Sequence, residues 1–297
     1  MAQTREIKKR MTAVKTIQRI TKTMQMIATA KFTAAVGRTK ASQPYTEKIR
    51  QLVGEVAGAA GDTSHPLIAG PDQPAGRELV LVITSDRGLC GSYNANVLRQ
   101  AVVHLRELKD KNSEFRLETS GKKAVGFFKF LKHTIDERHT FGDKPHYEEV
   151  ERLASRLIDE FTEGAYDAVR VVYMRFISNA RQRPEVLQLL PLKSEELAPD
   201  APRNESGDEE KSTEYDFSPS GRELLDDLLP MAVKTTLFQA FNEAVVSEQI
   251  MRMVAMKAAT ENAKDLGRTL KRDFNRARQS QITTELTEII AGAANLE

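Results

Sequence analysis

Two long stretches with apolar residues at helical spacing, one at each end of the chain, limit most strongly what this sequence can fold into. In residues 4–60 the apolar positions step by three or four, from Ile7 to Ile27 and again from Ile49 to Ala60. The same spacing fills the last part of the chain, residues 220–297. At 1.5 Å per residue these helices would be about 80 and about 100 Å long. Both exceed the width of a small domain, so we expect them to pair as an antiparallel coiled coil rather than bury their seams on the middle of the chain.

Each predicted helix contains one proline. Because proline lacks a backbone donor and its ring clashes with the preceding turn, Pro44 predicts a kink or short interruption near residues 42–45. Pro230 is likewise expected to kink the C-terminal helix or to split it into a short and a long piece. The N-terminal seam is predicted to consist of Ile7, Met11, Val14, Ile17, Ile20, Met24 and Ile27.

Between the helices, residues 77–192 alternate short apolar runs with amphipathic stretches. Runs such as 78–84 and 167–178 are typical of strands buried on both faces, and residues 147–164 have the spacing of an amphipathic helix. The run 184–192, bounded by Pro184 and Pro191, is predicted to be an edge strand. The alternation predicts an α/β fold: a Rossmann-like, open, mostly parallel sheet domain inserted between the two long terminal helices. The predicted segments are 1–60 and 220–297 for the helices, 77–192 for the sheet domain, and 193–219 for an acidic mobile loop.

Charge is distributed unevenly along the chain. Residues 1–40 hold ten Lys or Arg and a single acid, Glu6, whereas residues 193–216 hold nine acids. This polarity indicates different surroundings for the ends and the middle of the chain. The single cysteine, Cys90, excludes an intrachain disulfide, and no apolar run approaches the roughly 20 residues that cross a bilayer.

The segment 85–94, SDRGLCGSYN, follows the first predicted strand, where a dinucleotide would bind in a Rossmann-like domain. Its glycines give GxxG instead of GxGxxG, so a tight strand-to-helix turn is favoured over a nucleotide site. Cys90 has no triad-like histidine context, and the five histidines lack metal-ligand spacing. We therefore predict no catalytic residue, cofactor or metal. A nucleotide-binding α/β enzyme and a basic coiled coil that binds nucleic acid stay open as alternatives.

Three segments carry a family resemblance: residues 5–32 (REIKKRMTAVKTIQRITKTMQMIATAKF), residues 84–94 (TSDRGLCGSYN), and the C-terminal runs RMVAMKAATENAKDL and ARQSQITTELTEIIAGA. They resemble the gamma subunits of F-type ATP synthases. The resemblance implies a non-catalytic rotating shaft, whose coiled coil stands inside a ring of alternating alpha and beta subunits. Its α/β domain would form a foot against the epsilon subunit and the membrane c-ring. Proton flow through the ring would then drive ATP synthesis, reversibly, and no nucleic acid would bind.

The resemblance also assigns roles to single residues. Contacts with the beta subunit, including its acidic lever loop, are assigned to Lys9, Lys22, Met24, Arg252, Gln279, Thr283 and Glu285. Contacts of the foot or with the rotor ring are assigned to Arg87, Tyr215 and Phe217. Since residues 193–217 contain no cysteine, the thiol control of some family members is not expected. The start at Met1 without a presequence favours a bacterial protein, peripheral on the cytoplasmic side of the inner membrane.

Overall fold

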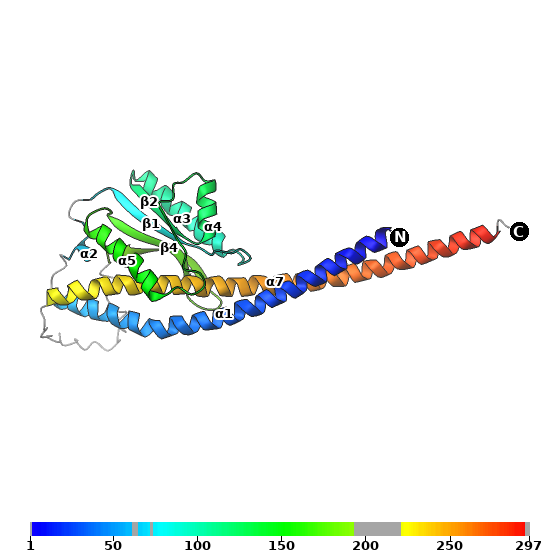
Figure 1. The fold of residues 1–297 in the computed structure, drawn as a ribbon, viewed down its shortest axis with the longest axis horizontal. Coiled ribbons are helices and arrows are strands. Elements are labelled where there is room, and N and C mark those ends of the chain that lie inside the picture. The colour runs from blue at the N-terminus through cyan, green and yellow to red at the C-terminus, as the bar shows by residue number, and fades with distance from the viewer. Residues whose placement is uncertain (1, 61–64, 72–73, 193–220, 295–297) are drawn as a thin grey trace, which may run out of the picture. The chain divides into compact units, whose positions relative to one another are not determined.

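The computed structural model describes residues 2–60, 65–71, 74–192 and 221–294. The predicted acidic loop, with Tyr215 and Phe217, lies outside these residues. The elements in chain order are α1 (Ala2–Ala60), α2 (Pro66–Ala69), β1 (Arg77–Ile83), α3 (Tyr93–Asp110), β2 (Glu114–Ser120), α4 (Lys122–Phe130), β3 (Glu137–His139), α5 (Tyr147–Thr162), β4 (Ala168–Phe176), β5 (Gln182–Leu190) and α7 (Gly221–Ala294) (Figure 1).

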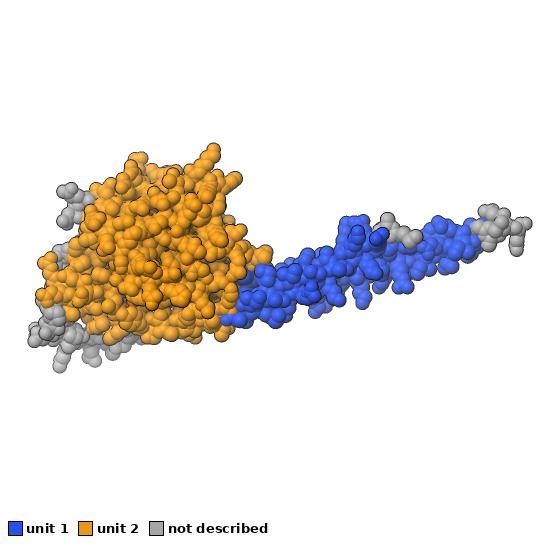
Figure 2. All heavy atoms as spheres, viewed as in Figure 1, with its two compact units in different colours: residues 1–30, 252–297 blue, residues 31–251 orange. Residues whose placement is uncertain are grey.

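Contacts divide the chain into two compact units (Figure 2). Unit 1 combines Met1–Ala30 with Arg252–Glu297, and unit 2 is Lys31–Met251. The division falls within the two long helices, so α1 and α7 each contribute residues to both units. None of the helices in the described ranges has a stretch long and apolar enough to cross a membrane.

Unit 2 is built on a five-stranded sheet in the order β3-β2-β1-β4-β5. The first four strands run parallel and β5 pairs antiparallel with β4 at the edge. The predicted α/β class, the mostly parallel sheet and the final edge strand are confirmed. The predicted start of that strand is wrong by two residues, because Pro184 pairs with Met174 inside β5. An edge position tolerates this proline, since one side of the strand needs no backbone donor.

Helices cover both faces of the sheet. Leu79, Leu81 and Ile83 of β1 point to the face that α5 covers, whereas Val80 and Val82 point to the face that α3 and α4 cover. All five side chains are at most 4 % exposed, which explains why the strand lacks an apolar–polar alternation.

The first third of α7 joins the same core, which corrects one expectation. Leu225, Leu229, Val233, Leu237 and Phe241 are buried in one cluster with the β1 and α5 residues. Ile49, Val53 and Val56 of α1 are buried in the same cluster, so the expectation that neither long helix buries its seam on the sheet domain is wrong for both helices. On the sheet face opposite α3 and α4, residues of α5, α7 and the C-terminal part of α1 form one core with the strands.

In unit 1, α1 and α7 form the predicted antiparallel coiled coil. The inward positions on α7 alternate steps of four and three: 256, 260, 263, 267, 270, 274, 277 and 281.

The predicted seam of α1 is partly wrong. Val14 is buried as expected, but Ile17, Ile20 and Ile27 are each 51 % exposed. Two successive steps of three move a residue about 120° around a helix, away from the partner. The positions that face inward there are instead Val14, Gln18, Thr21, Gln25 and Ala28. These small or polar side chains allow a narrow coiled coil and leave large apolar groups on its outside.

Neither proline interrupts its helix. Pro44 lies inside α1 and Pro230 inside α7, so of the two outcomes expected at each proline, a kink or a break, the break is wrong. Pro44 is exposed, and the Lys40 carbonyl that it leaves without a helical donor is beside solvent. In the case of Pro230, burial of Leu225, Leu229 and Val233 around it holds the helix together.

Candidate functional site

The outer surface of the coiled coil in unit 1 is unusually apolar. Ten large side chains of α1 and α7 are between 44 and 68 % exposed in unit 1, and three of them lie on the part of α7 that extends past the start of α1. They are Ile17, Ile20, Met26, Ile27, Val254, Leu266, Ile282, Leu286, Ile289 and Ile290. Single exposed apolar residues are ordinary on a soluble protein, but ten in one unit indicate a surface that another protein covers.

The same helix pair carries a groove of about 630 Å³ that is strongly basic. We call it the basic groove; its charged lining residues are Lys15, Arg19, Lys22, Lys257, Lys264 and Glu261. Five cations therefore surround one carboxylate. Thr12, Thr16 and Thr260 line it between the charges. Such a groove attracts an acidic partner, and the attraction weakens as salt is added.

Only Lys22 of the basic groove was assigned from the sequence. The others follow a pattern that could have revealed them: Lys15, Arg19 and Lys22 are spaced i, i+4, i+7, and Lys257, Glu261 and Lys264 repeat that spacing on α7. Residues at these spacings lie along one side of a helix. The spacing does not reveal that the two stripes border the same groove.

The remaining residues assigned to the beta subunit differ in accessibility. Lys9, Gln279, Thr283 and Glu285 are exposed, and Met24 is half-buried beside the exposed Met26. Glu285 accepts a hydrogen bond from Gln281 at 2.8 Å, one helical turn away. Arg252 differs from all of these because it is only 7 % exposed.

Arg87 projects from the turn between β1 and α3, and its side chain is 68 % exposed. It pairs with Asp143 at 2.9 Å, and Lys31 of α1 pairs with the same carboxylate. Asp86 instead accepts a hydrogen bond from the Lys122 amide at 3.0 Å. Arg87 is thus held by an ion pair within the chain and is still accessible to a partner.

The rest of this turn is internally bonded. Asn94 donates to Ser85 Oγ at 2.8 Å and to the Cys90 sulfur at 3.1 Å, and the Ser85 hydroxyl donates to the Arg87 carbonyl at 2.6 Å. Cys90 is 1 % exposed and packs in the core on the α3 side. The structural interpretation of this cysteine fits these contacts, since a nucleophile needs access to a substrate.

The crevice at the carboxyl ends of the parallel strands, where a Rossmann-like domain binds nucleotides, is filled. Thr84 and Gly121 border a cavity of only about 30 Å³ there, and its other side is α7, through Phe241, Ala244 and Glu248. This volume is about that of a single water molecule. The alternative of a nucleotide-binding enzyme is therefore not supported at this position.

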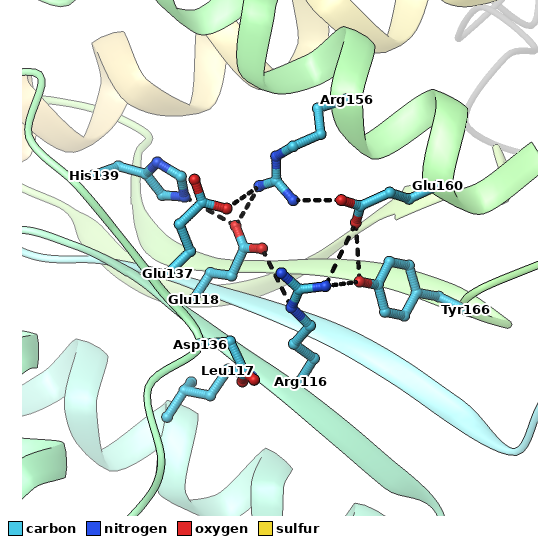
Figure 3. A network of polar contacts seen from close by, with 9 residues as sticks. All are labelled: Arg116, Leu117, Glu118, Asp136, Glu137, His139, Arg156, Glu160 and Tyr166. Carbon is cyan, nitrogen blue, oxygen red and sulfur yellow. Dashed lines mark hydrogen bonds and ion pairs between the residues drawn. The ribbon is translucent and has the colours of Figure 1, made fainter.

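A buried ion network joins β2, β3 and α5 (Figure 3). The Glu118 side chain has no exposed surface, and its Oε2 lies 2.7 Å from Arg156 Nη2 and 2.9 Å from His139 Nε2. Arg156 also bonds Glu137 at 3.1 Å and Glu160 at 2.9 Å. Burial would raise the pKa of Glu118, but the hydrogen bonds from His139 and Arg156 outweigh it and lower that pKa.

The network continues through Tyr166. Its hydroxyl donates to Glu160 at 2.9 Å and accepts a hydrogen bond from Arg116 at 2.8 Å. Burial, together with the Glu160 carboxylate, raises the pKa of Tyr166 to about 12, so the hydroxyl stays protonated as the donor. These residues lock β2, β3 and α5 together, and sequence reasoning did not find them.

Three members of the network, Glu118, Glu137 and His139, have ligand atoms within 4.8 Å of one another, close enough for a metal ion. However, the Arg156 guanidinium already forms ion pairs with both carboxylates, those of Glu118 and Glu137. A divalent cation in the same place would meet this fixed positive charge. The cluster is best explained as a buried ion network that stabilises the fold.

Comparisons with known proteins agree with this architecture. A family model described as ATP synthase matches residues 3–296. The ATP synthase gamma chain of Rhodopirellula baltica is 40 % identical over 298 residues, all of both chains, and that of Leptospira biflexa is 38 % identical over 294 residues, 99 % of each. A chain in the structure of the Euglena gracilis mitochondrial ATP synthase (OSCP, F1 and c-ring) has the same fold. Its TM-score is 0.68 at 22 % identity, covering 99 % of this chain and 95 % of that one.

The fold, with an α/β unit between long antiparallel helices, and the near-complete match define an ATP synthase subunit. The chain belongs to the family of ATP synthase gamma chains. The resemblance noted from the sequence is confirmed.

Proposed function

We propose that this chain is the central rotor shaft of an F-type ATP synthase. It transmits rotation between the membrane c-ring and the ring of alpha and beta subunits, so that proton flow drives ATP synthesis and ATP hydrolysis drives proton pumping. The chain itself is non-catalytic and needs no cofactor. Its partners are the alpha, beta and epsilon subunits and the c-ring. It influences ATPase activity through the catalytic sites of the beta subunits.

The apolar outer surface of unit 1 is the observation that carries this proposal. A coiled coil needs a buried seam, and between Val14 and Ala28 the inward positions of α1 hold mostly small or polar residues, while Ile17, Ile20 and Ile27 face out. Along this part of α1 the large apolar residues lie outside the seam, whereas a free-standing coiled coil keeps them inside it. This arrangement suits a shaft enclosed by a protein sleeve, which supplies the apolar contacts that the pair itself lacks.

The basic groove would meet the acidic lever loop of the beta subunit. A shaft can bias a catalytic site only by contacting its conformations differently, and charge on one side of the shaft does this as it turns. Lys22 lines this groove, and we propose that Lys9, Met24, Gln279, Thr283 and Glu285 also contact the beta subunit. For Arg252, whose side chain is mostly covered, a contact with the beta subunit would be limited to its small exposed part.

For the foot, we propose that Arg87, Tyr215 and Phe217 contact the rotor ring or neighbouring subunits. The exposure of Arg87 supports its part of this assignment. We also place the chain as a peripheral protein on the cytoplasmic side of a bacterial inner membrane. Support comes from its relatives in Rhodopirellula baltica and Leptospira biflexa, which cover essentially the whole chain.

Removing the charge of the basic groove tests this proposal. The fourfold variant Lys15→Gln, Arg19→Gln, Lys257→Gln, Lys264→Gln is assembled with its alpha and beta subunits. Exposed ion pairs contribute about 0.5 kcal/mol each, so four of them sum to about 2 kcal/mol, and we expect ATP turnover to fall by roughly tenfold or more. Added salt should slow the wild-type complex but have little further effect on the variant.

A charge-matched control carries four substitutions on exposed cations of unit 2: Arg99→Gln, Arg106→Gln, Lys111→Gln and Lys129→Gln. The control is expected to keep wild-type turnover and its salt dependence. Equal turnover in the groove variant and the control would reject an electrostatic role for the groove.

A further inference from the structure

A second groove, separate from the basic groove, lies in unit 2. It has a volume of about 540 Å³ and is bordered by α1, the loop between β3 and α5, and the first turn of α5. We call it the α5 groove; the lining residues that matter here are Lys31, Ala34, Arg38, Lys144, His146 and Glu149. None of these residues is among the subunit contacts that the family resemblance assigned.

The α1 side of the α5 groove is a regular stripe. Lys31, Ala34 and Arg38 are spaced i, i+3, i+7, so their side chains lie along one side of the helix. Ala34 is exposed and carries only a methyl group between the two cations. The small residue leaves space between the long side chains, and the space is open to a ligand.

One N–H donor of Arg38 has no hydrogen-bond acceptor among the described residues. Its Nε atom is buried, and among the described residues no acceptor lies within hydrogen-bonding distance of it. A guanidinium has five N–H donors, and a buried donor without an acceptor is unfavourable. The side chain as a whole is half-buried and lines the groove, so a ligand there contacts the part of Arg38 that has exposed surface.

The charges around the α5 groove favour an anion. Lys31, Arg38 and Lys144 contribute three cations, and Asp143 and Glu149 are the lining acids. Asp143 is already paired with both Lys31 and Arg87. Among the described residues, Arg38, Lys144 and Glu149 form no ion pair, so two cations and one acid remain to face the groove.

The first turn of α5 adds backbone donors. His146 is the N-cap residue of this 16-residue helix, and its side chain makes no capping hydrogen bond. Amide groups at a helix N-terminus point toward any ligand there, and the helix dipole favours negative charge. The arrangement therefore brings donors from α1, the loop and α5 around one space.

We propose that the α5 groove binds a phosphate-class oxyanion, with Arg38 as its main ligand. Arg38 supplies two parallel N–H donors to two oxygens, as guanidinium groups do with phosphate, and Lys144 supplies a second charge. The remaining oxygens face the first turn of α5. Inorganic phosphate and the phosphate tail of a nucleotide share this chemistry.

The test is a phosphate titration of the full-length chain in chloride buffer of constant ionic strength, followed by calorimetry. We expect saturable, one-to-one binding with a Kd of about 1 mM. The Arg38→Gln chain should bind at least about tenfold more weakly, and Lys144→Gln should weaken binding by a smaller factor. Arg38→Lys keeps the positive charge but loses the two parallel N–H donors of the guanidinium. Its affinity for phosphate should therefore lie between those of wild type and Arg38→Gln.

The matched control is Arg99→Gln, the same substitution at an exposed position of α3, which should leave binding unchanged. Circular dichroism checks that each variant is folded. If Arg38→Gln does not fold, the phosphate affinities of Lys144→Gln and Arg38→Lys still test the proposal. A competition with ADP distinguishes the two sources: displacement of phosphate by ADP identifies a nucleotide tail, and its absence identifies free phosphate. The proposal is overturned by an absence of saturable binding, or by equal binding in Arg38→Gln and Arg99→Gln.

Discussion

A chain carrying Gly121→Ala is expected to lose at least about 4 kcal/mol of its free energy of unfolding, or to fail to fold. Gly121 separates β2 from α4 and has a φ of +97°, where an L side chain is strained. An added Cβ would lie 2.2 Å from the carbonyl oxygen of Thr84 and 2.7 Å from its carbonyl carbon. Both atoms belong to the backbone, so no side-chain rotation relieves the overlap.

Thr84 cannot move away, because its neighbours bind it on several sides. Its amide donates to the Ser120 carbonyl at 2.8 Å, and its hydroxyl accepts a hydrogen bond from the Ala124 amide at 2.9 Å. The measurement is urea denaturation followed by circular dichroism. The control is Gly126→Ala, inside α4, where no atom lies within 4 Å of the new methyl group. That variant should be stabilised by about 0.5–1 kcal/mol, and similar stabilities for the two variants would contradict this account.

Arg156→Met is expected to destabilise unit 2 by about 3–5 kcal/mol. Methionine fills much of the same volume but leaves Glu118, which has no exposed surface, without its closest cation. Glu137 and Glu160 lose a partner as well. The control is Arg152→Met, one turn earlier in α5, where the arginine is exposed and donates to the Glu148 carbonyl. Its stability should change by less than about 1 kcal/mol.

The pH dependence of this difference identifies its cause. The pKa of Glu118 is lowered in the folded protein, so its stabilising effect is full above the unfolded pKa of about 4.5 and is lost as the pH falls below it. Once Glu118 is protonated, Arg156 has little left to stabilise. The stability gap between wild type and Arg156→Met should therefore shrink as the pH is lowered below about 4.5, through the lowered pKa of the folded protein. A gap that stays constant with pH would indicate lost packing instead.

Much of the fold could be predicted because local patterns determined it. The uninterrupted apolar run of β1 indicated a strand buried on both faces, and the spacing in α1 and α7 indicated long paired helices. The exposure of Ile17 and Ile20 could not be predicted, since it depends on which stripe of α1 meets α7. An apolar residue is a poor guide to the seam when the outside of the pair is apolar too.

The charged sites were harder to predict because they depend on the tertiary arrangement. Lys15 and Lys257 are far apart in the sequence and border one groove only after the helices pair. Glu118 lies in a strand of mixed character, and nothing local indicates that Arg156 reaches it from α5. The effect of the prolines also depends on the tertiary arrangement. Helix propensity alone favours a kink or a break at Pro44 and Pro230, whereas packing along α1 and α7 keeps both helices continuous.

The most direct measurement of the central claim is rotation of this chain within a fixed ring of alpha and beta subunits. The ring is attached to a surface, and a gold particle is attached to an exposed position of unit 2, such as a cysteine placed at Lys111. With ATP present, the particle should turn in one direction in discrete steps, and it should stop when ATP is removed. The chain on its own should show no ATP hydrolysis. A complex that hydrolyses ATP while the particle stays still, or hydrolysis by the isolated chain, would contradict the rotor function.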